Sequence, residues 1–388
     1  MDQRVRTWYS NNFESRLRGR YITLEHIQLL LQSHHDNYEI SVIGRSELGD
    51  DIHQIKIGKG KKTVLAWSQM HGNESTTTKA IFDILKFFTK NDSFKSEIST
   101  FLKNHSLYII PMLNPDGAKL YTRENANGID LNRDAQELSQ RESRVLNKLF
   151  QKLTPDLCLN LHDQRSLFGL STDQPASISF LSPAADPQRS NTTTRKIAMQ
   201  QIVRMNQVLQ SIIPGKVGRY DDSYNPACVG DTFQKAGTPT ILFEAGQSGN
   251  DYNREHSREL IFYTLLTLFG IIDTEDGCHE DYFLIPENKK NQRDFILRNA
   301  KLYNETKTCS IAIQYEEILI DEQINFIPKL NAIGDLDHLN GHNEVQINGA
   351  EILLNSQKSI DIGEIVSIIS NKNDDSLIYF DKNSFMIS

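Results

Sequence analysis

The sequence predicts an α/β protein with a mixed, largely parallel sheet flanked by helices, followed by a small C-terminal β domain. Short buried apolar runs alternate with longer amphipathic segments over residues 64–271, a pattern typical of βα units and parallel sheets. From about residue 273 the pattern changes to short alternating segments. The chain has 388 residues, whereas single cores stop growing at roughly 250 to 300 residues, so two domains are expected.

The first elements are a helix at 23–32 and two strands at 38–44 and 52–58, separated by the turn signal Glu47-Leu48-Gly49-Asp50. The chain then repeats a strand and a helix. Strands are predicted at 64–67, 107–112, 157–161 and 240–243, and helices at 78–88, 136–153, 193–213 and 254–271.

These elements divide the chain into an α/β domain at 1–272, a polar connector at 273–304 and a small antiparallel β domain at 305–388. Asn-Gly pairs at 340–341 and 348–349 mark turns within the last of these.

The composition is that of an ordinary globular protein, with 38% hydrophobic residues, 24% charged residues and a formal net charge of -8. Nothing in this balance suggests a nucleic-acid partner. The N-terminus lacks the apolar core of a secretory signal, and no apolar run approaches the ~18 residues of a membrane span. We therefore expect a cytoplasmic protein without a membrane partner. The sequence predicts no particular oligomeric state.

Residues capable of chemistry follow three of the predicted strands. His71 and Glu74 come after the first, His162 after the third and Glu244 after the fourth. The carboxyl ends of parallel strands meet over one crevice, so these four side chains should lie at the same edge of the sheet.

Two histidines and a glutamate suit a catalytic zinc, which takes three protein ligands and keeps one position open. The His71-x-x-Glu74 spacing alone is weak, because many helix starts show it. His162 strengthens the prediction, because it also follows a predicted strand and can therefore lie beside this pair. From position alone Glu244 fits two roles, either the general base that takes a proton from water or an acid paired with a nearby cation.

A polar segment at 123–134 contains Arg123 and Arg133. An arginine suits the oxyanion of a tetrahedral intermediate, and its fork suits a terminal carboxylate, so each arginine could serve one of these needs. The composition of the segment equally fits a solvated loop.

Several motifs together resemble the M14 (carboxypeptidase A-like) family of zinc carboxypeptidases over residues 20–270. They occur in the order found in that family and comprise Gly44-Arg45-Ser46 with Leu48-Gly49, His71-Gly72-Asn73-Glu74, Asn114-Pro115-Asp116-Gly117, Gly128-Ile129-Asp130-Leu131-Asn132-Arg133, and the strand-end His162 and Glu244.

This resemblance implies a metallopeptidase that binds one Zn2+ per chain and hydrolyses a C-terminal peptide or similar amide next to a free carboxylate. It assigns the metal to His71, Glu74 and His162, the acid/base role to Glu244, oxyanion stabilisation to Arg123, and substrate binding to Asn132, Arg133 and the mobile Tyr224, with Tyr220 as a second choice for that tyrosine. The stretch that sets side-chain preference in the family reads Val229-Gly230-Asp231-Thr232.

Two departures favour other substrates. Asp163 follows the third ligand where digestive members have a serine, which predicts a charged cleft. The added β domain resembles the C-terminal extension of the aspartoacylase and succinylglutamate desuccinylase branch. The alternatives are therefore a zinc deacylase or amidase of N-acyl amino acids or murein peptides and, in another class, a non-enzymatic relative that binds peptides.

Overall fold

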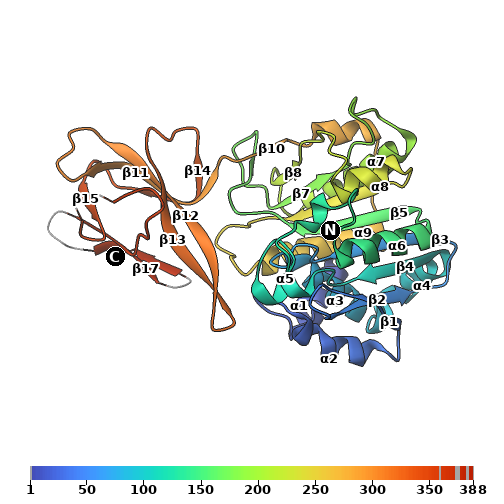
Figure 1. Cartoon of the computed structure of the whole chain (residues 1–388). Coiled ribbons are helices and arrows are strands. Elements are labelled where there is room, and N and C mark those ends of the chain that lie inside the picture. The colour runs from blue at the N-terminus through green and yellow to red at the C-terminus, as the bar shows by residue number, and fades with distance from the viewer. Residues whose placement is uncertain (1, 358–359, 372–375, 382–383, 388) are drawn as a thin grey trace. The chain divides into compact units, whose positions relative to one another are not determined.

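The computed structural model describes residues 2–357, 360–371, 376–381 and 384–387 (Figure 1). The chain forms two compact units. Unit 1 comprises Met1–Gln164 and Ala176–Asn288, and unit 2 comprises Arg165–Pro175 and Lys289–Ser388. The eleven residues Arg165–Pro175, which we call the strap, thus belong to the C-terminal unit although they follow β5 of the first.

Unit 1 is an α/β domain, as predicted. Its strands are β1 (Glu39–Arg45), β2 (Asp51–Ile57), β3 (Lys62–Ser68), β4 (His105–Ile110), β5 (Leu157–Asp163), β7 (Ile178–Leu181), β8 (Val217–Arg219) and β9 (Thr240–Ala245). Its α-helices are α1 (Gln3–Asn12), α2 (Leu24–His34), α3 (Thr76–Thr89), α4 (Lys95–Asn104), α5 (Pro115–Leu120), α6 (Arg141–Leu153), α7 (Thr193–Gln210), α8 (Val229–Lys235) and α9 (Glu255–Leu268).

The strands of unit 1 form one eight-stranded mixed sheet in the order β1-β2-β4-β3-β5-β9-β7-β8. The four central strands, β4, β3, β5 and β9, run parallel, and antiparallel pairing occurs toward the edges. The predicted strands at 64–67, 107–112, 157–161 and 240–243 are these four, and each is buried because both faces of the sheet are covered.

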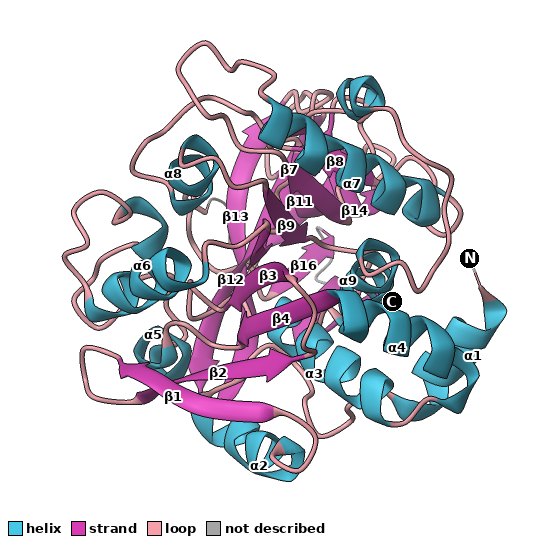
Figure 2. Cartoon of the chain, turned by 90° about the vertical axis from the view of Figure 1, so that its right-hand side faces the viewer, coloured by secondary structure: helices cyan, strands magenta, loops and turns pink. Residues whose placement is uncertain are grey.

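The two faces take alternate side chains of each central strand. Val64 and Ala66 join a large core with residues of α3, α7 and α9, whereas Leu65 and Trp67 join a smaller core with residues of α6 and α8. Figure 2 shows these two helical layers on opposite sides of the sheet. The helix predicted at 136–153 begins only at Arg141, because the carboxylate of Asp134 accepts bonds from the backbone of Ser139 and Gln140 and holds that segment in a turn.

Unit 2 is a β domain, but it is not purely antiparallel. Its strand β11 (Gln292–Leu302) pairs antiparallel with β12 (Cys309–Ile320) and parallel with both β14 (Asn340–Gln346) and β15 (Glu351–Leu354). The remaining strands are β6 (Gly169–Leu170), β10 (Asn288–Lys289), β13 (Gln323–Gly334), β16 (Ile368–Asn371), β17 (Ser376–Asp381) and β18 (Ser384–Ile387).

The division of the chain differs from the predicted one at two places. The expected connector at 273–304 contributes Asp273–Asn288 to unit 1, and its remainder includes strand β11 of unit 2. The Asn-Gly pair at 340–341 opens β14 instead of forming a turn. Asn348 and Gly349 do form a turn, with φ of 54° and 78° and a backbone bond from Ala350 N to Ile347 O.

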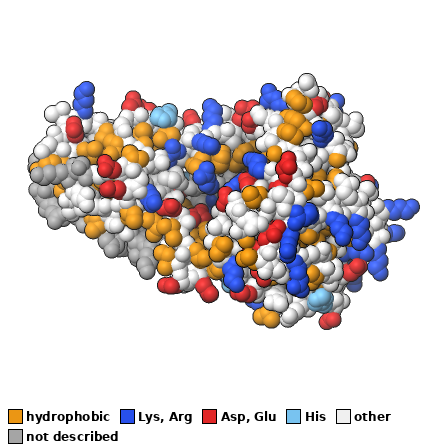
Figure 3. Space-filling view, viewed as in Figure 1, with side chains coloured by type: hydrophobic (Ala, Val, Ile, Leu, Met, Phe, Trp, Pro, Cys, Tyr) orange, Lys and Arg blue, Asp and Glu red, His pale blue; other side chains and the backbone are white. Residues whose placement is uncertain are grey.

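Acidic and basic side chains are interspersed over the face that Figure 3 presents, with hydrophobic side chains scattered between them. No helix in the described part of the chain is both long enough and apolar enough to cross a membrane.

Candidate metal centre and active site

The carboxyl ends of β3, β5 and β9 bring the predicted metal ligands together. His71 and Glu74 lie between the end of β3 and the start of α3, and His162 is the penultimate residue of β5. Nδ1 of His71 is 2.8 Å from Oε1 of Glu74, and Nδ1 of His162 is 2.8 Å from Oε2 of the same carboxylate. The potential ligand atoms of the three residues all lie within 4.8 Å of one another.

The chemistry of this donor set fits a divalent cation. The Nδ1 atoms of His71 and His162 are 3.1 Å apart, and both residues are buried, with 2% and 1% of their surface exposed. Two imidazole lone pairs at that distance repel each other unless a proton or a metal ion lies between them. Two nitrogens and one carboxylate are the donors of many catalytic zinc sites.

Asp130 holds the ring of His71, the first of the predicted ligands. Its Oδ1 lies 3.0 Å from Nε2 of His71 and also accepts a bond from the backbone N of Asn132. A proton on Nε2 leaves Nδ1 free as a ligand atom, which is the usual arrangement of a carboxylate behind a metal-bound histidine. Burial would raise the pKa of Asp130, but His71 and the nearby arginines hold it well below its usual value. The sequence showed this residue within a motif, but we assigned it no role.

The surroundings of Glu74 favour its ionised form. Burial alone would raise the pKa of its carboxyl, but His71 and His162 lower it well below the usual value. The backbone N of Asp163 donates to Oε2 of Glu74, which fixes the carboxylate from the side of β5.

Glu244 has the opposite environment. It is the direct neighbour of His162 in the parallel pairing of β5 and β9, and its Oε2 is buried without a hydrogen-bond partner among the described residues. Burial, followed by repulsion from Glu74 and Asp163, raises the pKa of Glu244 well above its usual value, although Arg123 and Arg254 oppose this. A carboxylate with a raised pKa is a stronger base, which suits the acceptance of a proton from a neighbouring water molecule.

Arg123 reaches the same cluster from the loop after α5. Its Nη1 lies 3.2 Å from Oε1 of Glu74, and its Nε lies 3.1 Å from Oδ2 of Asp130. These two carboxylates hold the guanidinium, whereas 41% of the side chain remains exposed. A fixed cation with an open face is what stabilisation of an oxyanion requires.

The other predicted binding residues lie around the 3-10 turn Leu131–Arg133 and the start of α8. Oδ1 of Asn132 accepts a bond from the backbone N of Val229, so this side chain ties the turn to α8. Arg133 is exposed, and its Nη1 donates to the carbonyl of Asn132. Tyr224 is partly buried in the loop before α8. Within the described contacts, neither Arg133 nor Tyr224 bonds to the three metal-binding residues.

Asp163 does not add charge to a cleft, contrary to the interpretation from the sequence. It is buried, and its Oδ2 accepts bonds from the backbone N and Oγ1 of Thr76, the first residue of α3. It therefore stabilises the helix that follows Glu74.

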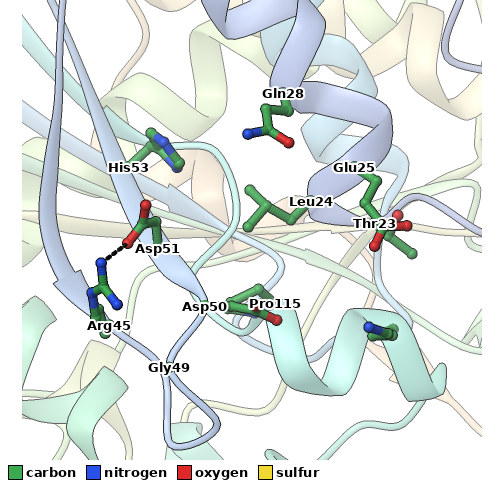
Figure 4. A pocket seen from close by; sticks show the side chains of 11 residues that line it. Thr23, Leu24, Glu25, Gln28, Arg45, Gly49, Asp50, Asp51, His53 and Pro115 are labelled. Atoms are coloured by element: carbon green, nitrogen blue, oxygen red, sulfur yellow. Dashed lines mark ion pairs between the residues drawn. The ribbon is translucent and has the colours of Figure 1, made fainter.

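A polar pocket lies elsewhere in unit 1, between the first turn of α2, the β1–β2 hairpin and α5 (Figure 4). His53, Gln28 and the ion pair of Arg45 with Asp51 line it, and its volume is about 280 Å³. None of the metal-binding residues lines this pocket, so it is separate from the metal centre.

Residues 23–267 match the family model that describes zinc carboxypeptidases of the peptidase M14 family. Carboxypeptidase 2 of Trichophyton rubrum is 27% identical over 99 residues, and a zinc carboxypeptidase of Saccharothrix mutabilis subsp. capreolus is 25% identical over 103 residues. Each match covers 25% of this chain and only 18% and 24%, respectively, of the two relatives.

Solved structures share the fold at low identity. A metallo-carboxypeptidase from Burkholderia cenocepacia has a TM-score of 0.53 at 17% identity, covering 68% of this chain and 70% of its own. Carboxypeptidase A from Helicoverpa armigera has a TM-score of 0.51 at 17% identity, covering 70% and 78%. Because the family model covers more than half of the sequence, the chain belongs to the peptidase M14 family of zinc carboxypeptidases.

Proposed function

We propose that this protein is a zinc-dependent metallocarboxypeptidase that hydrolyses the C-terminal peptide bond of a substrate with a free carboxylate. The observation that carries the proposal is the register of β5 and β9, which sets Glu244 beside His162, while His71, Glu74 and His162 converge as ligands. Family membership supports the same activity.

Zinc held by these three residues would supply a Lewis acid for the scissile carbonyl and lower the pKa of a water molecule. Glu244 takes the proton from the attacking water and returns it to the leaving nitrogen, a role that its raised pKa favours. Arg123 faces the developing oxyanion. Arg133, together with the amide of Asn132, holds the terminal carboxylate, and Tyr224 closes over the bound residue.

The test compares peptides with a free C-terminus, the same peptides amidated, N-acyl amino acids and murein peptides, each followed by mass spectrometry. Release of the last residue from free-acid peptides alone supports the proposal. Because the added β domain resembles the C-terminal extension of the aspartoacylase and succinylglutamate desuccinylase branch, deacylation of an N-acyl amino acid or cleavage of a murein peptide is the second candidate, and the same assay separates the two.

One zinc ion per chain is part of the proposal, and elemental analysis tests it. Among the described residues a second group of potential ligands, Cys278, His279 and Glu280, lies at the surface. The number of zinc ions per chain should therefore be measured for the wild type and for Cys278→Ser, and both should hold one tightly bound ion. A chain that holds none would be a peptide-binding relative without activity. The cytoplasmic location stays a prediction from the sequence, which cell fractionation tests.

A further inference from the structure

The chain passes between the two units at three places, and all three meet on one side chain of unit 1. It leaves unit 1 after Gln164, returns at Ala176 and leaves again after Asn288. Nε2 of Gln164 donates to the carbonyl of Ala176 at 2.5 Å, and Oε1 of Gln164 accepts from Nδ2 of Asn288 at 3.0 Å. The side chain of Gln164 therefore links the points where the strap and the C-terminal segment join the catalytic unit.

Gln164 lies two residues beyond His162, and its backbone is fixed as firmly as its side chain. Its N donates to the carbonyl of Ala245, the residue after Glu244, and its carbonyl accepts from Nη2 of Arg254. Nη1 of Arg254 donates to Ala245 as well. The ends of the two strands that carry His162 and Glu244 are thus joined at Gln164.

The side chain of Gln164 is closely packed against Gly246 and Ala176. Gln164 is only 4% exposed, and a Cβ on Gly246 would lie 2.4 Å from its Nε2 and 2.0 Å from the carbonyl of Ala176. Gly246 is therefore required for the side chain of Gln164 to cross the end of β9.

The third crossing point, Asn288, contacts β7, the strand that pairs with β9 on the side away from β5. Nδ2 of Asn288 donates to Oγ of Ser179 at 2.9 Å, and Ser179 is the antiparallel partner of Glu244 in the pairing of β7 with β9. The contacts of Gln164 and Asn288 thus involve the ends or flanks of β5, β7 and β9.

On the far side of the crossings, the strap is held within unit 2. Nε2 of Gln314 donates to Oγ of Ser166, and Nε2 of His342 bonds to the carbonyl of Ser166, both at 2.8 Å. The backbone N of Gln292 donates to the carbonyl of Leu167. The segment that leaves the metal-binding strand is therefore an integral part of the C-terminal unit.

We infer that Gln164 is a positioning residue of the active site, which holds the three chain crossings together and thereby sets the places of His162 and Glu244. The expected effect of Gln164 on kcat rests on the proposed function, whereas its expected effect on zinc affinity does not. The C-terminal unit, through the strap, is then a structural requirement of the metal centre.

The test replaces Gln164 with Met in the full-length chain, which keeps the volume and removes both side-chain bonds. The matched control is Gln234→Met, because Gln234 is 1% exposed and also makes one donated and one accepted bond, to Oγ1 of Thr194 and N of Thr240. Thr240 begins β9 at the end away from Glu244. Both variants should lower Tm similarly.

Only Gln164→Met should raise the zinc dissociation constant, by about tenfold or more, as loss of outer support for metal ligands does. It should also lower kcat with little change in KM and speed hydrogen exchange at 160–166 and 176–181.

Equal zinc affinity in the two variants would overturn the inference. If Gln164→Met does not fold, Asn288→Ala, which removes one of the two side-chain bonds of Gln164 together with the bonds between Asn288 and Ser179, should also raise the zinc dissociation constant, and unchanged zinc affinity there would overturn the inference. An inactive wild type with the expected difference in zinc affinity would count against the proposed function alone.

Discussion

His162 and Glu244 stand opposite one another in the parallel pairing of β5 and β9. The sheet register therefore places the third proposed metal ligand beside the carboxyl that we propose as the base. A slip of one residue would turn Glu244 to the other face of the sheet, and both faces are buried, so the register is strongly specified.

Replacing Glu244 with Gln should reduce kcat by about a thousandfold or more, because the amide cannot accept the proton from water. The amide has nearly the same size and leaves the three ligands in place, so zinc content should stay at the wild-type value. Steady-state kinetics and elemental analysis on the same sample make the comparison. Activity within tenfold of the wild type would remove Glu244 from the mechanism.

Removal of the metal should destabilise the protein. The Nδ1 atoms of His71 and His162 lie 3.1 Å apart beside the buried carboxylate of Glu74, and an ion bound here would join the β3–α3 loop, which carries His71 and Glu74, to the end of β5. Treatment with a chelator should lower Tm by several degrees, and added zinc should restore it. The variant His162→Ala should begin with a lower Tm and show little response to chelator, whereas a chelator-insensitive wild type would contradict the assigned metal site.

Arg133→Ala should raise KM by about tenfold or more for peptides with a free C-terminus, since loss of a charge-assisted bond costs roughly 1.5–3 kcal/mol. Amidated peptides, if they are cleaved at all, should be unaffected. Arg141→Ala is the matched control, because Arg141 is also exposed and its side chain forms an ion pair with Glu47 at the surface. An equal effect of Arg133→Ala on both substrate types would exclude carboxylate recognition by Arg133.

Asp163→Ala should lower the free energy of unfolding by about 1–2 kcal/mol, because α3 loses the carboxylate that accepts from Thr76. Thr76→Val, which removes only the hydroxyl bond, should cost less. The relative rates for peptides with basic and acidic last residues should stay the same in Asp163→Ala. A shift of preference toward acidic residues would show that Asp163 faces substrate after all.

Asp231 should make stability depend on pH. Burial raises its pKa from 3.8 to about 6, so its contribution to stability is fully present below pH 3.8 and is lost as the pH rises through about 6. Asp231→Asn keeps an acceptor for the backbone N of Asn225 and carries no charge. It should therefore be more stable than the wild type by about 1–2 kcal/mol at pH 8 and about equally stable at pH 4. Denaturant unfolding at the two pH values measures the difference in stability between the variant and the wild type. An equal difference at both pH values would show that the ionisation of Asp231 is not its cause.

The sequence was sufficient for features that depend on local pattern. Apolar runs located the four central strands, and polar residues directly after them located His71, Glu74, His162 and Glu244, because parallel strands end at one edge. Features that depend on distant partners were not predicted. Nothing near Asp163 shows that it stabilises a helix that begins at Thr76, and nothing near Asp130 shows that it orients His71.

The place of the strap in unit 2 could not be predicted for the same reason. The strap contains no long apolar run, and it joins unit 2 through backbone and side-chain bonds to residues more than a hundred positions away, such as Gln292 and Gln314. The parallel pairing of β11 with β14 was likewise invisible, since short strands separated by turns suggest neighbouring hairpins.

Because the strap belongs to unit 2, the order of synthesis limits when the end of β5 can fold completely. A ribosome releases His71, Glu74, His162 and Glu244 well before it has made β11, β12 and β14, on which the strap depends. Domains usually fold as they emerge, but the strand that carries His162 continues into a segment whose partners are made more than a hundred residues later. We expect a nascent chain stopped at residue 288 to bind zinc more weakly than one that also contains β11, β12 and β14, so the proposed activity would arise only after these strands are made.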